Sequence, residues 1–433
     1  MNDNATEALW KRATTILASG TWSVSHGAYT YPDGVFPLMA KGGKGCRIVD
    51  TNDQVYIDWL MAWGTTILGY RDAAVEDAVI RQLQSCGSLF SLLHPIEVET
   101  AELLREIVPS AEGVAFAKNG SDGLGAAARL ARATTGRDLI LVCGYHGFHD
   151  WYVASLPWVD GLPDVAREWV KPFRYNDEKQ LSDLFEEHRG QIAAVFMEPV
   201  KEELPHVGYL EFVRNLTLDH GALLVFDEVI TAFRVSRGGA QEFFELTPDL
   251  SCLGKAMGNG FAISALCGKR DLMEELPRIG YGSTFRGETT SLAAARATLE
   301  QILIQPINDH VARVGDQLRR GFEAACSRFG VTAGLHGHSS RMTMKIMATG
   351  SLSSIELETL FIQECLRNGV FTNGLFLPSA AHDDEAVSFT IATFHVAVER
   401  VAQAIAHDST SSLLYMHGAN FFDPRIKTKE KRA

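Results

Sequence analysis

The sequence lacks the features that define several broad classes of protein. It has no basic excess, because 40 Lys and Arg stand against 53 Asp and Glu and give a net charge of −13, which argues against general nucleic-acid binding. The seven cysteines are scattered and contain no Cys-x-x-Cys pair, so neither a zinc ribbon nor a redox dithiol is indicated. No basic-then-apolar leader opens the chain, and no uncharged run could cross a bilayer. We therefore expect a cytoplasmic protein that binds neither nucleic acid nor membrane.

What the chain does have is enough length and apolar content for substantial cores. Its 433 residues are 46% hydrophobic, which suits two or three globular domains. We expect an N-terminal segment over residues 1–60, a large domain over 61–300, a smaller domain over 301–410 and a tail over 411–433. The tail is basic near its end, and we expect a solvated or disordered terminus there.

The large domain shows short apolar runs that alternate with helical stretches. Continuous apolar strands separated by helices predict an α/β fold with a mostly parallel sheet buried on both faces. Farther along, long amphipathic helices with few strands predict a smaller α+β domain, and a hairpin pattern lies near the start of the chain. The segments concerned are the strands 139–142, 193–197 and 222–226, the helices 178–188, 210–220 and 307–329, and the hairpin 45–59.

One lysine and one aspartate carry the strongest chemical signal. Asp227 closes an apolar run, and Lys255 follows it 28 residues later among small residues. A lysine amine can form a Schiff base with the aldehyde of pyridoxal phosphate (PLP), and a carboxylate can hold a proton on its pyridine nitrogen, which makes the ring an electron sink. Taken alone, Lys255 is more simply explained as a surface lysine in a Gly-rich loop, and Asp227 as a helix cap or an ion-pair partner of Arg234; the residues around them favour the cofactor interpretation.

A polar turn between a strand and a helix is a candidate phosphate site. Residues 113–132 read as a strand, the turn Asn119-Gly120-Ser121 and then a helix. A helix N-terminus offers free amides and partial positive charge, although a plain helix cap explains the same residues. The hydroxyl-rich loop 282–291, before a helix over 292–302, could also meet a phosphate or be an ordinary capped loop.

An aromatic residue lies where it could stack on a pyridine ring. Tyr145 follows a strand, and Val229, two residues after Asp227, could pack on the opposite ring face. A metal site of His146, His149 and Asp150 is the rival interpretation, although no fourth ligand is evident. A simple core position is the other interpretation of Tyr145.

These stretches together resemble the class III, fold-type-I PLP aminotransferases, and the glutamate-1-semialdehyde 2,1-aminomutase branch in particular. The resemblance covers roughly residues 8 to 405. Its most specific parts keep both their order and their spacing. They are Phe226-Asp227-Glu228-Val229-Ile230-Thr231-Ala232-Phe233-Arg234, Thr247-Pro248-Asp249-Leu250 and Leu253-Gly254-Lys255, with Trp63-Gly64, Tyr145-His146-Gly147 and Met197-Glu198-Pro199-Val200 in support.

The resemblance implies a role for each matching position. Lys255 matches the Schiff-base lysine and proton shuttle, and Asp227 matches the partner of the ring nitrogen. Tyr145 and Val229 match the residues that sandwich the ring. The implied fold adds a smaller α+β domain built from N- and C-terminal segments.

The resemblance also implies a homodimer with active sites at the interface. Asn119, Gly120 and Ser121 stand where the family has its phosphate turn. Thr284 matches a threonine that reaches the phosphate of the neighbouring subunit.

Two positions depart from the aminomutase pattern. His26 stands where the aminomutases have an arginine that pairs with a substrate carboxylate, and Glu288 replaces the asparagine of a Gly-Asn-Pro run. Loss of a bidentate guanidinium weakens carboxylate recognition. We predict substrate contacts for His26, Trp63 and Glu288.

The sequence therefore predicts an intermolecular aminotransferase that moves an amine from a donor to a keto sugar or another polar carbonyl acceptor. An intramolecular aminomutase is the alternative. A non-catalytic PLP-fold protein is disfavoured because both Lys255 and Asp227 are present.

Overall fold

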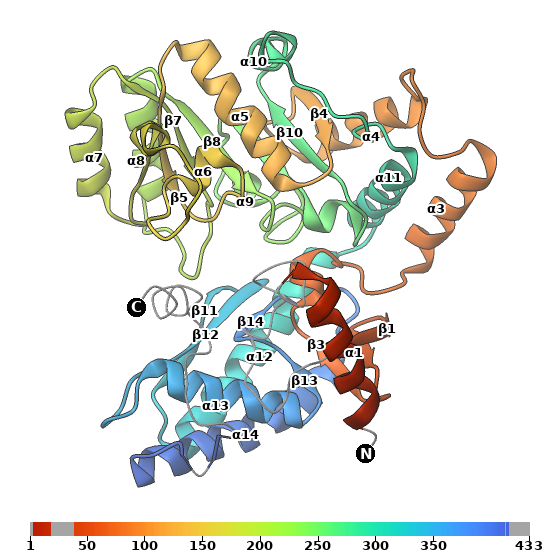
Figure 1. The fold of residues 1–433 in the computed structure, drawn as a ribbon, viewed down its shortest axis with the longest axis vertical. Helices are drawn as coiled ribbons and strands as arrows, with labels where there is room; N and C mark the ends of the chain where they lie inside the picture. The colour runs from red at the N-terminus through yellow and green to blue at the C-terminus, as the bar shows by residue number, and fades with distance from the viewer. Residues whose placement is uncertain (1–2, 19–38, 412, 415–433) are drawn as a thin grey trace. The chain divides into compact units, whose positions relative to one another are not determined.

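The computed structural model describes residues 3–18, 39–411, 413 and 414, and the chain forms two compact units (Figure 1). The larger unit comprises Ala62–Ile67 and Asp72–Asn308. The smaller unit comprises Met1–Met61, Leu68–Arg71 and Asp309–Ala433. Within the described part of the chain, no helix is both long and apolar enough to cross a membrane.

A seven-stranded sheet forms the centre of the larger unit. The strand order is β4-β10-β9-β8-β7-β5-β6, and only β10 runs antiparallel to its neighbours. The expected mostly parallel α/β sheet is therefore confirmed. The strands are β4 (Gly113–Ala117), β5 (Leu139–Cys143), β6 (Val170–Pro172), β7 (Ile192–Met197), β8 (Leu223–Glu228), β9 (Leu250–Leu253) and β10 (Ser264–Gly268).

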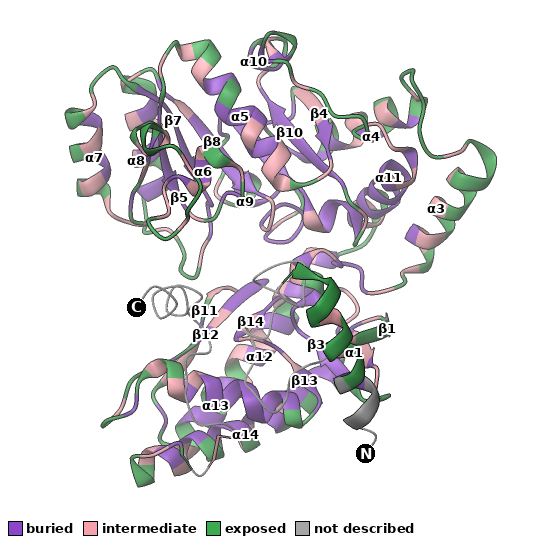
Figure 2. Ribbon diagram, viewed as in Figure 1, coloured by how far each residue is buried: buried purple, intermediate pink, exposed green. Residues whose placement is uncertain are grey.

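Helices cover both faces of this sheet, which explains why its strands are apolar throughout. Ile140 and Val142 of β5 pack in one cluster with the alanine-rich face of α5 (Gly120–Thr135). The alternate β5 residues, Leu139 and Leu141, pack with α7 (Glu178–Glu187) and α8 (Tyr209–Asp219) on the other side. Successive side chains of a strand point to opposite faces, so both sets are buried (Figure 2).

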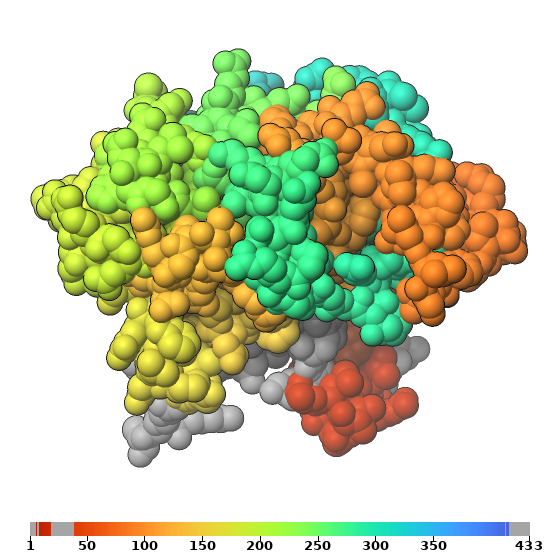
Figure 3. Space-filling model, turned by 90° about the horizontal axis from the view of Figure 1, so that it is seen from above, coloured from red at the N-terminus to blue at the C-terminus, as the bar shows by residue number. Residues whose placement is uncertain are grey.

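Helix α11 (Thr289–Ile304) packs against α3 (Ala73–Ser85) and α4 (Pro95–Ile107), and the space-filling view shows the α3 and α4 region in orange (Figure 3). The prediction that this helix begins at Leu292 was wrong by three residues. The carboxylate of Glu288 accepts hydrogen bonds from the amides of Thr290 and Ser291, so the first turn forms earlier. The short helices are α2 (Met61–Gly64), α6 (Asp150–Val153), α9 (Ala240–Phe243), α10 (Arg270–Met273), η4 (Asp164–Trp169), η5 (Lys255–Gly258) and η6 (Leu276–Ile279).

The smaller unit is α+β, as predicted, and draws on both ends of the chain. It has the sheets β1-β2-β3-β13 and β11-β12-β14, and β2 pairs with β3 as the expected antiparallel hairpin. Phe322, Phe361 and Phe394 pack together in its core. The elements are α1 (Asp3–Ile16), β1 (Ala40–Lys44), β2 (Arg47–Asp50), β3 (Val55–Asp58), α12 (Ile307–Phe329, which starts in the larger unit), β11 (Ala333–His338), β12 (Arg341–Ile346), α13 (Ser354–Arg367), β13 (Val370–Phe371), β14 (Leu375–Phe376) and α14 (Asp384–His407).

Candidate active site

The predicted chemical residues of the larger unit gather at one edge of the seven-stranded sheet. Strands β4, β5, β7, β8 and β9 all run in one direction, so their carboxyl ends meet at this edge. The edge of such a sheet is where α/β proteins bind ligands. Asp227 lies at the end of β8 opposite Cys252 of β9, and Lys255 follows β9 by two residues.

Asp227 is a buried carboxylate with two hydrogen-bond donors. Only 4% of the residue is exposed. Its Oδ2 lies 2.8 Å from Nδ1 of the fully buried His146, and its Oδ1 accepts the amide of Val229 at 3.1 Å. His146 Nε2 is buried without a hydrogen-bond partner among the residues that the structure describes.

Lys255 opens the 3-10 turn η5 in an uncommon backbone conformation. Its φ is 43°, in the left-handed region that residues other than glycine seldom adopt. The preceding Gly254 lies close to Val229, since a Cβ built on Gly254 would be 3.5 Å from Val229 Cγ1. Such conformations cluster at functional sites, where the surrounding structure holds them in place.

The turn Asn119-Gly120-Ser121 lies at the start of α5, as the sequence predicts. The Asn119 side chain caps the helix by accepting the amide of Asp122 at 3.1 Å, and Ser264 of β10 donates to the Asn119 carbonyl at 2.7 Å. A Cβ on Gly120 would be 2.7 Å from Val229 Cγ2. The predicted cap is therefore present, and the N-terminus of a helix suits a phosphate.

A second loop reaches the same turn. A Cβ on Gly147, whose φ is +91°, would be only 2.1 Å from Ser121 Oγ. Glycine is needed here because both the backbone conformation and the close approach exclude a side chain. The Tyr145-His146-Gly147 segment thus connects the Asp227 contact to the phosphate turn.

Tyr145 is held through its backbone while its ring stays largely open. The residue is 64% exposed, and its amide donates to Glu198 Oε1 at 2.9 Å. Tyr152 packs edge-on against the Tyr145 ring with centroids 5.7 Å apart, and its hydroxyl donates to the Gly144 carbonyl. Partial desolvation of its hydroxyl and the nearby Asp227 charge raise the pKa of Tyr145.

Sequence reasoning assigned no such role to Glu198 or Tyr152. Glu198 follows the fully buried strand β7 directly, and Asp227 comes after the apolar residues of β8. An acid placed directly after an apolar strand is the signal that could have found it. Nothing local marks Tyr152, because its contact with Gly144 depends on the path of the intervening loop.

Glu288 lies in an ion pair. Its Oε2 is 3.0 Å from Lys118 Nζ, and both side chains are more than four-fifths buried. The Thr290, Ser291 and Lys118 hydrogen bonds outweigh the effect of burial and lower the pKa of Glu288 to about 2. The predicted substrate contact of Glu288 stays a prediction.

The three residues that the alternative metal-site interpretation would need as ligands each have different neighbours. His146 pairs with Asp227, His149 lies 3.8 Å from a carboxylate oxygen of Asp122, and Asp150 begins α6. Among the residues that the structure describes, no three His, Cys, Asp or Glu side chains converge as metal ligands would.

The remaining predicted residues differ in what the structure shows of them. His26 lies outside the described residues. Trp63 lies in a turn of left-handed residues, with φ of 60°, and the buried Arg234 donates to the carbonyl of the next residue, Gly64, at 3.0 Å. Thr284 is exposed, in the loop between Gly282 and Glu288.

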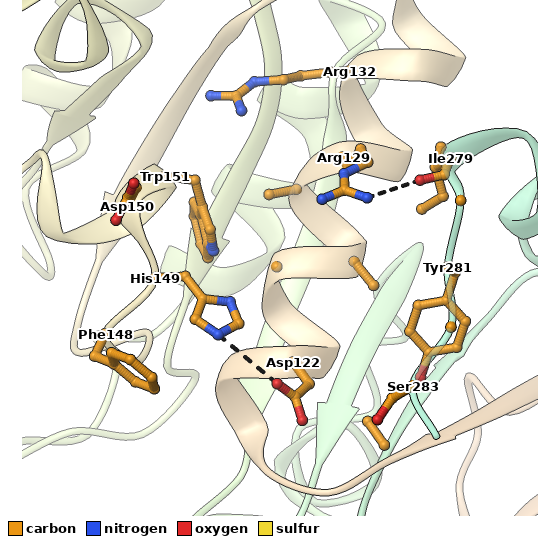
Figure 4. Close-up of a pocket in the computed structure, with 16 residues that line it drawn as sticks. Asp122, Arg129, Arg132, Phe148, His149, Asp150, Trp151, Ile279, Tyr281 and Ser283 are labelled. Carbon is orange, nitrogen blue, oxygen red and sulfur yellow. Dashed lines mark hydrogen bonds and ion pairs between the residues drawn. The ribbon is translucent and has the colours of Figure 1, made fainter. Parts of the chain in front are cut away.

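A cavity of about 600 Å³ lies beside the phosphate turn, along the outer face of α5 (Figure 4). Its walls combine both signs of charge with aromatic rings. Arg129 is held by the Ile279 carbonyl at 2.8 Å. The side chains that set its chemistry are Asp122, Arg129, Phe148, His149, Trp151 and Tyr281.

Comparison with known proteins agrees with this arrangement. The family described as Aminotransferase class-III matches residues 29–373. The chain is 33% identical to 3-aminobutyryl-CoA aminotransferase of Cloacimonas acidaminovorans, over 92% of this chain and 97% of that protein. It is 34% identical to glutamate-1-semialdehyde 2,1-aminomutase of Methanothermobacter thermautotrophicus, over 89% of this chain and 96% of that protein.

Solved structures share the fold over nearly the whole chain. The PLP internal aldimine form of the Sphingopyxis sp. MTA144 FumI protein is 31% identical, with a TM-score of 0.87 over 93% of this chain and 97% of that one. An omega-transaminase from Sphaerobacter thermophilus is 26% identical, with a TM-score of 0.84 over 93% and 98%.

The fold and the edge of the sheet thus define a fold-type-I PLP enzyme. The chain belongs to the class III aminotransferase family, and its cofactor is pyridoxal phosphate. The residues fit that group. Asp227 is a buried carboxylate suited to a protonated ring nitrogen, and the first turn of α5 suits a phosphate.

Proposed function

We propose that this protein is an intermolecular aminotransferase whose chemistry centres on Lys255 and Asp227. The observation that carries the proposal is the meeting of three features at one sheet edge. Buried Asp227 is the last residue but one of β8, Lys255 follows the adjacent β9, and the Asn119–Ser121 turn contacts Val229 beside them.

Each residue has a role that follows from its surroundings. Lys255 would hold the cofactor through its amine and, once released, move the proton at the carbon that bears the substrate amine. Asp227 would keep the pyridine nitrogen protonated, and His146 would hold Asp227 in place. Bound PLP supplies the electron sink that makes that proton acidic. Tyr145 and Val229 would confine the ring from its two faces.

We favour an amino donor whose amine-bearing carbon is not next to a free carboxylate. We favour as acceptor a polar carbonyl compound such as a keto sugar. Two observations support this choice. His26 stands where the resemblance places an arginine for a carboxylate. The relative from Cloacimonas acidaminovorans is named for a 3-amino acyl thioester.

A substrate panel tests this choice. The PLP-loaded protein is assayed with several amino donors against α-keto acids, keto sugars and simple ketones. We expect the highest kcat/KM with an acceptor that lacks a carboxylate beside the carbonyl. Replacement of His26 should change substrate KM and leave the cofactor spectrum intact, whereas loss of the spectrum would remove His26 from a substrate role.

An intramolecular aminomutase is the second candidate. The 34% identity to a glutamate-1-semialdehyde 2,1-aminomutase favours it. The PLP-loaded protein can be incubated with glutamate 1-semialdehyde and no other amine or carbonyl compound. Formation of 5-aminolevulinate at a catalytic rate would replace the intermolecular proposal with this one.

We also propose a homodimer in which Thr284 completes the partner's phosphate site. Exposed apolar residues near the start of α11 support such an interface, because large apolar patches are uncommon on monomers. The amide of Thr289 donates to the Ser88 carbonyl, which ties the segment after Ser88 to the loop that carries Thr284. The exposed fractions are 46% for Phe90, 84% for Leu92, 71% for Leu93 and 57% for Phe285.

Light scattering tests the dimer. We expect twice the chain mass, 47.5 kDa per chain, and a shift toward monomer in a Leu92→Asp/Leu93→Asp variant. A native protein that stays monomeric at micromolar concentration would refute the interface.

We further propose a cytoplasmic location. The seven cysteines are all free and six are buried, as in a reducing compartment.

A further inference from the structure

A buried ion pair joins two segments that both border the cofactor site. Lys118 and Glu288 are 170 residues apart in sequence, yet Nζ and Oε2 lie 3.0 Å apart. Lys118 immediately precedes the phosphate turn Asn119-Gly120-Ser121, whereas Glu288 ends the loop that carries Thr284. In the described part of the larger unit, this is the ion pair that connects these two segments.

Glu288 is fixed from two directions. Its Oε1 accepts the amides of Thr290 and Ser291, and its Oε2 accepts from Lys118 Nζ and from the Ser291 amide. Its pKa of about 2 keeps it charged at any physiological pH. With both side chains more than four-fifths buried, loss of one charge would leave the other without compensation in a poorly solvated place.

The loop before Glu288 is exposed in its middle and is also held at its end by Thr289, whose amide and hydroxyl donate to the carbonyls of Ser88 and Gly87. Its short-range hydrogen bonds are Arg286 to the Ser283 carbonyl and Glu288 to the Phe285 carbonyl. Thr284 and Phe285 are exposed. The end of this loop is therefore held by Glu288, and through it by Lys118, together with the contacts of Thr289 to the segment at Gly87 and Ser88.

We propose that Lys118 and Glu288 are positioning residues for the cofactor phosphate: their ion pair sets the loop 282–288 against the phosphate turn, so that Thr284 is presented to the partner's site. This inference rests on the proposed dimer and on the proposed roles of the turn and Thr284. The pair acts through Thr284 on one site and through Asn119–Ser121 on the other. Neither side chain needs to touch the cofactor.

PLP affinity of the apo-protein measures this role directly. Apo-protein is prepared by removing the cofactor and is titrated with PLP while the visible absorption is followed. We expect Lys118→Met to weaken PLP binding about 10-fold or more, and Lys118→Arg, which keeps the charge, to stay within about 3-fold of the native protein. The matched control is Lys179→Met, which removes an exposed ion pair with Asp183 on α7.

A double-mutant cycle with Thr284→Val separates positioning from plain structural support. If Lys118 acts through Thr284, Lys118→Met should weaken PLP binding much less in the Thr284→Val background than in the native one. Fully additive effects would overturn the proposal. So would a Lys118→Met variant that lowers the melting temperature but binds PLP normally.

Measurements on the native protein distinguish failure of the ion-pair proposal from failure of the proposed function. If native apo-protein regains the visible band with PLP and is dimeric, the proposed site stands and the variants test the ion pair alone. If native apo-protein does not bind PLP, the proposed site itself is wrong and the ion-pair proposal falls with it.

Discussion

Nδ1 of His146 lies 2.8 Å from Oδ2 of Asp227, and both side chains are almost completely buried. This contact orients the carboxylate that we assign to the cofactor's pyridine nitrogen. A hydrogen bond to a charged group contributes about 1.5–3 kcal/mol, which corresponds to a factor of about 10–100 in rate.

Removal of this donor should slow the reaction without loss of the fold. We expect His146→Leu to lower the single-turnover rate with an amino donor about 10- to 100-fold. His146→Asn, whose side-chain amide can still donate, should lose less. Stopped-flow absorbance gives both rates. The exposed His206 supplies the control variant His206→Asn, and equal rates for His146→Leu and the native protein would contradict the assignment.

Gly120 should not tolerate a side chain. A methyl group there would lie 2.7 Å from Val229 Cγ2 and 3.2 Å from Cγ1. We expect Gly120→Ala to weaken PLP binding at least 10-fold and to cost about 1–3 kcal/mol of stability through overpacking. PLP titration and urea unfolding measure the two effects.

A second-site change checks the cause. Adding Val229→Ala to Gly120→Ala removes the contacting methyl groups and should recover much of the lost stability. Gly42→Ala, at a glycine with open space around it, is the matched control. Unchanged stability in Gly120→Ala would mean that the turn adapts and does not require glycine.

The Glu288 carboxylate should make folding stability depend on pH. Its pKa is about 2 in the folded protein against an ordinary 4.5, so the unfolded chain binds the proton more readily between these values. The stabilisation is complete above about pH 4.5 and is lost as pH falls toward 2. We expect Glu288→Gln to lower the free energy of unfolding by about 1–3 kcal/mol at pH 7.

Urea unfolding at pH 7, 5, 4 and 3 measures the difference in free energy of unfolding between the native protein and Glu288→Gln. This difference in free energy of unfolding should be constant from pH 7 to 5 and should become smaller at pH 4 and 3. A gap that widens as the pH falls would show that the carboxylate is not stabilised by its charge in the folded protein. Glu245→Gln, at an exposed position, is a suitable control.

The sheet, and the convergence of Asp227 and Lys255 at one of its edges, could be predicted because their signals are local. Strands β5, β7 and β8 are continuous apolar runs, and an acid directly follows or closes two of them. Asp227 and Lys255 stand at strand ends that adjoin in the sheet. A parallel α/β pattern alone brings such ends together.

Contacts between distant segments could not be predicted in the same way. The start of α11 was missed because Glu288 serves as a cap, a role more usual for Ser, Thr, Asp or Asn. The partner of Glu288 is 170 residues away, and Tyr152 meets Gly144 through a loop path that no local pattern specifies. These contacts depend on tertiary structure.

The most direct test of the central claim is the visible absorption spectrum of the PLP-loaded protein, recorded before and after an amino donor is added without any acceptor. The donors are L-glutamate, L-alanine and 3-aminobutyrate, and Lys255→Ala is recorded in parallel. We predict that at least one donor removes the band of lysine-bound cofactor and leaves pyridoxamine phosphate, and that Lys255→Ala never shows that band. A native band that no donor changes, or a Lys255→Ala protein with the native band, would contradict an aminotransferase that works through Lys255.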